Sequence, residues 1–115
     1  MKRFGILIVP ALSGVAMQAQ AITGNQLYET CRHYNPPHTN EAGSYCRGYV
    51  AGVIETLPPE LSKYTCLPDG IDANRLTLVV RDYLADNREK LQEEASILVN
   101  WALINSFPCR DIPPE

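Results

Sequence analysis

The apolar positions of this chain follow two different patterns, which meet near residue 21. From Phe4 to Met17 they form a nearly continuous run, which follows the basic pair Lys2-Arg3 and precedes the small-residue site Ala19-Gln20-Ala21. These features are typical of a secretory signal peptide, and the run is short for a membrane-spanning helix. The sequence therefore predicts a signal peptide over residues 1–21 and a single mature domain over residues 22–115.

Beyond residue 21 the apolar residues recur at helical spacing. Thr23 and Gln26 occupy the N-cap and N3 positions of a capping box, in which each side chain bonds the other residue's backbone amide. The next apolar residues, spaced i, i+4 and i+7, define one face of a short helix: Leu27, Cys31 and Tyr34. The prolines of Asn35-Pro36-Pro37 end this helix, so residues 35–43 are predicted to form a polar loop.

A second helix is predicted over residues 44–57, where apolar residues fall on two adjacent stripes. One stripe comprises Tyr45, Tyr49 and Val53, and the other comprises Cys46, Val50 and Ile54. Two adjacent apolar stripes predict that this helix is the central and most buried one. Gly48 and Gly52 lie one turn apart. Because glycine costs a helix about 1 kcal/mol relative to alanine, the pair suggests that another helix approaches closely there.

The remainder of the chain is predicted to be a connection followed by two helices. Pro58-Pro59 begins a segment without helical or alternating pattern, which extends to Gly70. The third helix is predicted to begin after its N-cap Asp72 and to end at Asn87. Asn87 is also the predicted cap of the fourth helix, which Pro108 terminates. Apolar residues at helical spacing define the two inner faces: Leu76, Val79, Val80, Tyr83 and Leu84, then Leu91, Ala95, Leu98, Val99, Ala102, Leu103 and Phe107.

These four helices predict a small all-α fold, since no segment alternates with a period of two residues over a useful length. The core is expected on their facing stripes, at Leu27, Tyr49, Val53, Leu76, Val80, Leu84, Leu98, Ala102 and Phe107. A mature domain of under 100 residues buries a modest core, so its margin of stability is thin and disulfides are an expected supplement.

The four cysteines of the chain are expected to form two disulfides in an exported protein. A short link between the third and fourth helices makes them antiparallel neighbours, which places the start of one beside the end of the other. Cys66 precedes the third helix and Cys109 follows the fourth, so this pairing is favoured, and Cys31 is left to pair with Cys46. Spacing alone leaves the two other pairings open.

Charge and residue chemistry narrow the possible functions. Without Lys2 and Arg3 the chain has 8 basic and 13 acidic side chains, a net charge of about −5, which argues against binding to nucleic acid or anionic lipid. One segment contains four zinc-ligand side chains at non-standard spacing, Cys31, His33, His38 and Cys46. A disulfide flanked by two loop histidines is the stronger alternative. No nucleophile, catalytic carboxylate pair or phosphate loop can be assembled, so neither an enzyme nor a cofactor is predicted.

Two aromatic residues each have two possible roles. Trp101 lies one step off the apolar stripe of the fourth helix, where it would pack at the margin of the core or stand exposed as an anchor for a partner protein. Packing is the preferred interpretation. Tyr64, in the connection between the second and third helices, would either tether that loop to the helices or contact a partner.

Three segments together resemble one protein family. Residues 45–52, Tyr-Cys-Arg-Gly-Tyr-Val-Ala-Gly, are similar to its Y-C-x-G-Y-[IV]-x-G signature, and residues 66–71, Cys-Leu-Pro-Asp-Gly-Ile, to its C-x-P-x-G-[VI] turn. Residues 83–109 are similar to its closing helix, although Asn87-Arg88 stands where the family often has His-Pro. The family is the periplasmic Rap/Tai-type immunity proteins, which protect bacteria against cell-wall amidases delivered by type VI secretion and are similar in architecture to HdeA-type acid-stress chaperones.

The resemblance implies a disulfide-stapled, HdeA-like four-helix domain. It also implies a periplasmic, non-catalytic homodimer that binds and occludes the active site of a peptidoglycan amidase effector. Two loops could project into a catalytic cleft, residues 35–43 and 58–65. The candidate partner-binding residues on them are Glu60, Ser62, Lys63, Tyr64, His38 and Asn40. The alternatives are an HdeA-like chaperone and another binding protein of the envelope.

Overall fold

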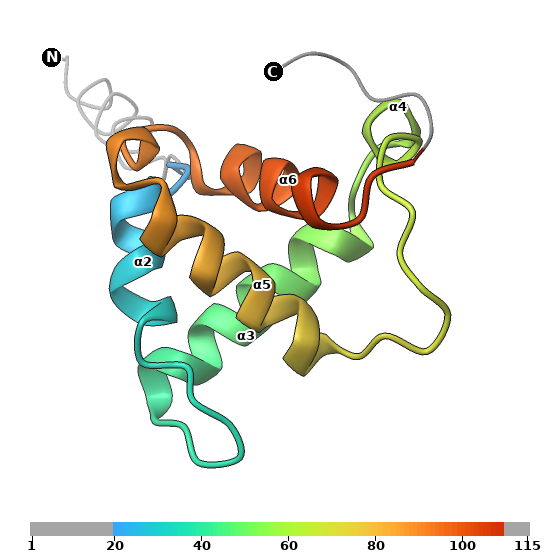
Figure 1. Ribbon diagram of the computed structural model, residues 1–115. Coiled ribbons are helices and arrows are strands. Elements are labelled where there is room, and N and C mark those ends of the chain that lie inside the picture. Colours follow the sequence, from blue (N-terminus) through green and yellow to red (C-terminus); the bar gives the residue numbers. More distant parts are fainter. Residues whose placement is uncertain (1–19, 110–115) are drawn as a thin grey trace, which may run out of the picture.

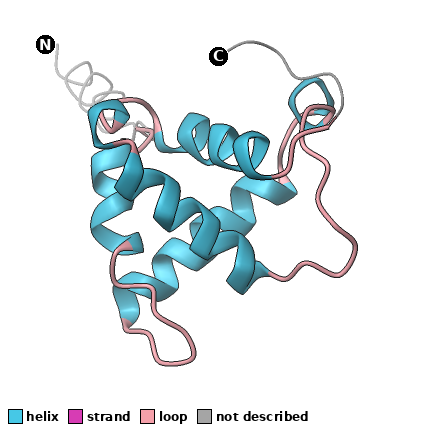
Figure 2. Cartoon of the chain, viewed as in Figure 1, coloured by secondary structure: helices cyan, strands magenta, loops and turns pink. Residues whose placement is uncertain are grey.

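Four long helices and one short helix make up most of the computed structural model, which describes residues 20–109. They are α2 (Gly24–Cys31), α3 (Glu41–Glu55), α4 (Pro59–Ser62), α5 (Ala73–Asp86) and α6 (Ala95–Ser106), with a 3-10 turn over Arg88–Lys90 (Figure 1). The described residues form only helices and loops, apart from two isolated β-bridges (Figure 2). The all-α prediction is therefore confirmed. The signal-peptide prediction falls almost entirely outside the described residues.

Local side-chain bonds set the starts of the helices. The Thr23 amide donates to Gln26 Oε1 at 2.9 Å and the Gln26 amide donates to Thr23 Oγ1 at 3.2 Å, which confirms the capping box. Asp72 accepts from the Arg75 amide at 2.9 Å, which confirms the predicted cap of α5. Helix α3 begins at Glu41 and not at residue 44, because the side chain of Asn40 accepts a bond from the Gly43 amide at 2.9 Å. The loop before it is correspondingly shorter than predicted.

The glycines that allow close packing are not the ones predicted. A Cβ atom at Gly48 or Gly52 would meet nothing within 4 Å, because both lie on an exposed face of α3. A Cβ atom at Gly24 would lie 2.8 Å from the carbonyl oxygen of Leu91, and one at Gly43 would lie 2.8 Å from that of His33. The close approaches therefore occur at the first turns of α2 and α3, and no segment lies against α3 at Gly48 or Gly52.

Helix α6, and not α3, is the most buried helix. It contacts α2, α3 and α5, and Figure 1 shows it lying across the bundle. Its buried residues are Ala95, Leu98, Val99, Asn100, Ala102, Leu103 and Ile104, whereas α3 buries only Gly43, Cys46 and Val50. The predicted core is correct at Leu27, Leu76, Val80, Leu84, Leu98 and Ala102, whereas Tyr49, Val53 and Phe107 pack only partly buried against it.

The link between α5 and α6 is longer than predicted and holds the start of the domain. Asn87 ends α5, but its side chain donates to the carbonyl of Tyr83 at 2.8 Å and does not cap α6. Leu91, predicted in the last helix, is buried in the link. The amides of Gly24 and Asn25 donate to carbonyls of this link at 2.8 Å, and the Ala95 amide donates to Ile22 at 2.9 Å. Amides at the starts of both α2 and α6 are therefore satisfied by each other's flanking segments.

Both favoured disulfides are present, Cys31–Cys46 and Cys66–Cys109. The first joins the end of α2 to α3, and both of its cysteines are fully buried. The second joins the connection before α5 to the residue after α6, where the Cys66 amide also donates to the Phe107 carbonyl at 2.8 Å. Because both sulfurs of the first pair are in this bond, the alternative zinc site with His33 and His38 lacks its thiolates.

Candidate functional site

Of the predicted contact residues after α3, Glu60 and Ser62 lie on a short helix, and Lys63 and Tyr64 follow it directly. Residues 58–70 were expected to be irregular, but Pro59–Ser62 form α4. Glu60, Ser62 and Lys63 are exposed, whereas Tyr64 is partly buried, with the Lys63 ammonium 5.2 Å from the centre of its ring. The Cys109 amide donates to the Tyr64 carbonyl at 3.2 Å, directly beside the Cys66–Cys109 disulfide. This segment therefore projects from a braced base.

The other predicted contact loop lies at a separate end of the molecule. Figure 1 shows it at the bottom of the bundle, away from α4 at the upper right. His38 is exposed on it, whereas Asn40 is occupied as the cap of α3. The structure therefore does not bring the six candidate residues together, but divides them into two groups.

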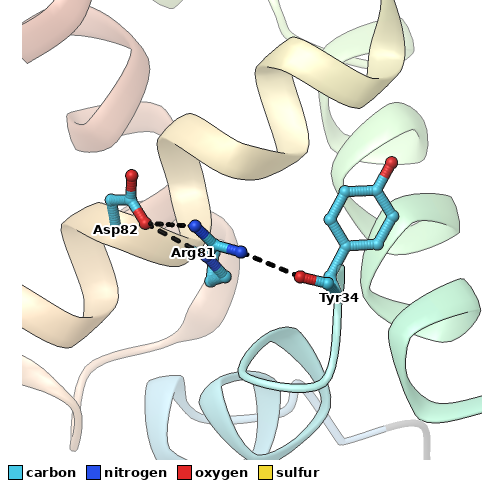
Figure 3. Close-up of polar contacts among 3 residues, drawn as sticks. All are labelled: Tyr34, Arg81 and Asp82. Carbon is cyan, nitrogen blue, oxygen red and sulfur yellow. Dashed lines mark hydrogen bonds and ion pairs between the residues drawn. The ribbon is translucent and has the colours of Figure 1, made fainter. Parts of the chain in front are cut away.

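A polar cluster anchors the lower loop to α5 (Figure 3). The Arg81 guanidinium donates to the carbonyl of Tyr34 at 2.9 Å and pairs with Asp82 at 3.0 Å. The Tyr34 hydroxyl bonds Asn74 Oδ1, which also accepts from Arg47 Nε at 2.9 Å. These partners belong to three different elements, and the cluster therefore fixes the base of the loop.

A groove of about 420 Å³ lies between the end of α3, α4 and α6. None of its lining residues is charged: Val53, Thr56, Leu57, Pro58, Leu61, Ser96, Ile97, Asn100 and Trp101. We call it the α3–α4–α6 groove. Leu61 and Ile97 in its wall are 39% and 41% exposed, so two large apolar side chains are accessible on one surface. The chain thus presents an apolar concavity directly beside the predicted contact residues of α4.

Trp101 packs at the margin of the core, as the preferred interpretation predicted. It also lines the α3–α4–α6 groove. With Ile97 it also lines an adjoining hollow of about 310 Å³, whose other residues include Lys90 and Glu93. Ile97 and Trp101 are spaced i, i+4 on α6 and therefore lie side by side. The groove and the hollow share these two residues as a common wall.

Asn100 is the polar residue of the groove that the sequence pattern did not reveal. It is only 7% exposed, and within the described residues its Oδ1 atom is buried without a hydrogen-bond partner. An unsatisfied buried polar atom costs roughly 1–3 kcal/mol, so such an atom is uncommon in a helix that otherwise completes a core. An asparagine within the run Leu98-Val99-Asn100-Trp101 was the available sequence signal.

Two tyrosines continue this surface along α3. The rings of Tyr45 and Tyr49 stack with centroids 6.3 Å apart, and Tyr45 is 50% exposed. Tyr49 is hydrogen-bonded to Ser96, which lines the groove. Burial, and then the nearby Tyr45 and Glu94, raise the pKa of Tyr49 above its ordinary value of 10.0, although the bond to Ser96 opposes this.

We expect Tyr49 to ionise only above about pH 10. Because its pKa is higher in the folded than in the unfolded chain, its contribution to stability is complete below about pH 10 and is lost as the pH rises through the folded-state pKa. An alkaline absorbance titration of the wild type, from which that of Tyr49→Phe is subtracted, isolates this ionisation. A difference curve with its midpoint at or below pH 10 would contradict the assignment.

The described residues contain no cluster of three or more histidine, cysteine or acidic residues placed to hold a metal ion. No helix among residues 20–109 is both long and apolar enough to cross a membrane.

A family model of the Rap1a immunity proteins matches residues 23–109, which includes all five described helices. No match was found among curated proteins.

Proposed function

Because the chain belongs to the Rap1a immunity protein family, we propose that it is a periplasmic inhibitor of a peptidoglycan amidase effector delivered by type VI secretion. The family match carries this proposal, because it covers the whole folded body and supports immunity against a secreted effector. The finer features are part of the proposal: export by the segment 1–21, a homodimer, and inhibition by occlusion of the active site.

Helix α4 is the proposed inhibitory segment. It projects from the fold with exposed Glu60, Ser62 and Lys63, and the Cys66–Cys109 disulfide lies directly after it. A segment that is already ordered loses little conformational entropy when it docks into a cleft. The loop that carries His38 is the second choice, since the polar cluster around Arg81 holds its base.

Substitutions in the α4 segment should weaken inhibition without unfolding the protein. We expect Lys63→Glu and Tyr64→Ala each to raise the concentration needed for half-inhibition of the cognate amidase by at least about tenfold, which corresponds to 1.4 kcal/mol or more. The measurement is hydrolysis of purified peptidoglycan at increasing concentrations of immunity protein. The matched control is Arg75→Glu, which reverses an exposed charge on α5.

The outcomes separate the alternatives. If both variants inhibit as well as the wild type while Pro37→Ala or His38→Ala does not, the inhibitory segment is the lower loop. If the wild type inhibits no amidase but keeps unrelated acid-unfolded proteins in solution, the HdeA-like chaperone function replaces the proposal.

A further inference from the structure

We propose that the Cys66–Cys109 disulfide is a redox-sensitive switch for the α4 segment, which spans residues 58–66, and that a dithiol reductant opens it without unfolding the domain. The inference rests on the proposed function, because α4 is the proposed inhibitory segment. The oxidised protein holds that segment in place for docking, and the reduced protein releases it. The switch thereby makes inhibition depend on the redox state of the surroundings.

The α4 segment has little packing of its own. None of residues 58–66 is buried, and Figure 1 shows α4 at the edge of the bundle. Leu67 and Ile71, which follow it, pack only partly buried against the core. The hydrogen bonds of α4 itself join residues of the same segment to one another. Regions with few buried apolar contacts open at a small cost in free energy, so this segment depends on what holds its end.

The end of the segment is held at the disulfide. Within the described residues, two hydrogen bonds join residues 58–71 to another part of the chain. In one, the Cys66 amide donates to the Phe107 carbonyl at 2.8 Å. In the other, the Cys109 amide donates to the Tyr64 carbonyl at 3.2 Å. Both donors belong to the disulfide-bonded residues, and so short a pairing of two strands is marginal without a covalent link.

The two disulfides differ in their surroundings, so one can open while the other stays closed. Cys66 is exposed and Cys109 is partly buried, whereas Cys31 and Cys46 are fully buried. One thiolate of the dithiol attacks Cys66 Sγ, which forms a mixed disulfide and releases Cys109 as a thiolate. The second thiol then displaces Cys66. The dithiol ends as a cyclic disulfide, and two electrons and two protons have passed to the protein as two thiols.

Opening releases one segment and leaves the rest of the fold in place. Helices α2, α3, α5 and α6 contact one another directly, and the Cys31–Cys46 disulfide still joins α2 to α3. Thr65 favours the open form, because its Oγ1 atom is buried without a hydrogen-bond partner among the described residues and would gain water. A released segment must be ordered again before it can dock, so reduction weakens binding to a partner.

Selective opening is tested first by thiol trapping. The folded wild-type protein is treated with dithiothreitol, and its free thiols are trapped with iodoacetamide. We expect peptide mapping to recover both cysteines of the Cys66–Cys109 pair in alkylated form, with Cys31–Cys46 intact, while circular dichroism still shows a folded helical protein. Opening of Cys31–Cys46 at the same rate overturns the proposal.

Trypsin then measures the release of the segment. Cleavage after Lys63, in the α4 segment, should be at least about tenfold faster in the opened than in the oxidised protein, because proteolysis follows the population of open chain. Cleavage after Arg47, an exposed residue of α3 beside the closed disulfide, is the matched control and should keep its rate. An unchanged rate at Lys63 overturns the proposal, and so does equal acceleration at Arg47, which would mean that the whole domain unfolds.

The effect on inhibition is measured without reductant in the assay. The double variant Cys66→Ser, Cys109→Ser represents the open form, and we expect half-inhibition of the cognate amidase to need at least about tenfold more of it than of the oxidised wild type. Reduced wild type should regain inhibition after dithiothreitol is replaced by oxidised glutathione. Equal inhibition by the variant and the wild type overturns the switch. If the oxidised wild type inhibits no amidase, the proposed function fails, and cleavage after Lys63 decides whether the disulfide controls the segment.

Discussion

Leu98→Ala should lower the free energy of unfolding by about 2–5 kcal/mol, a large part of the stability of a domain this small. Leu98 is 1% exposed and lies in α6, the helix that contacts α2, α3 and α5. Its truncation would leave a cavity that the surrounding helices cannot fill without moving. Urea unfolding followed by circular dichroism measures the loss. Ile97→Ala, one position earlier at a 41% exposed site, should cost less than about 1 kcal/mol.

The effects of substitutions at Leu98 and Gly24 on the free energy of unfolding should be coupled. A Cβ atom at Gly24 would clash with Leu98 Cδ1 and approach the Leu91 carbonyl oxygen at 2.8 Å. Leu98→Ala removes the first of these clashes, so the Gly24→Ala, Leu98→Ala double variant should lose less stability than the sum of the single variants. Strict additivity, or an unchanged midpoint for Leu98→Ala, would mean that α2 and α6 do not meet as described.

Removal of the Cys66–Cys109 disulfide should destabilise the domain by about 4 kcal/mol in the chain-entropy model. This disulfide closes a loop with a sequence separation of 43, against 15 for Cys31–Cys46, so its loss frees more of the unfolded chain. The variant Cys66→Ser, Cys109→Ser should also allow the α4 segment to move away from the end of α6. Thermal and urea unfolding measure the first effect, and limited proteolysis near α4 measures the second.

The two disulfides should also differ in their access to reductant. Cys66 is exposed, whereas Cys31 and Cys46 are fully buried. Mild reduction of the native protein should therefore open Cys66–Cys109 first, because thiol–disulfide exchange requires an attacking thiolate to reach a sulfur. Alkylation followed by peptide mapping identifies the opened pair. Recovery of alkylated Cys31 before alkylated Cys66 would contradict this order.

Most of the features that the sequence predicted correctly depend on residues within one helical turn or on the order of the helices. Thr23 with Gln26 and Asp72 with the amide of Arg75 act within one helical turn, so their caps could be identified from the sequence. The pairing of Cys66 with Cys109 followed from the order of two helices. Asn40 had the residue type of a cap as well, but the prolines and glycine around it made the whole segment resemble a loop, and the helix start was placed too late.

The features that could not be predicted depend on contacts between distant segments. Gly48 and Gly52 have the spacing of a packing motif, but no other segment approaches them, whereas Gly24 needs its missing side chain because Leu91 and Leu98 lie against it. The α3–α4–α6 groove combines residues from 53 to 101. The groove exists because Pro59–Ser62 form a helix whose Leu61 lies beside Ile97 and Trp101 of α6. The place of Asn100 in this groove could not be predicted either, because the apolar residues around it in the sequence indicate only that this part of the helix is buried.

The bonds between the Ile22–Asn25 segment and residues 91–95 also determine when the domain can fold. The first described helix is held by the segment that precedes the last one, and α6 completes the core against helices made long before it. Ribosomal synthesis proceeds from the N-terminus, so an unfinished chain lacks the partners for its own first turn. The core can therefore be completed only after α6 has been made. The Cys66–Cys109 disulfide likewise needs a cysteine that follows the last described helix, whereas Cys31 and Cys46 are both available much earlier in synthesis.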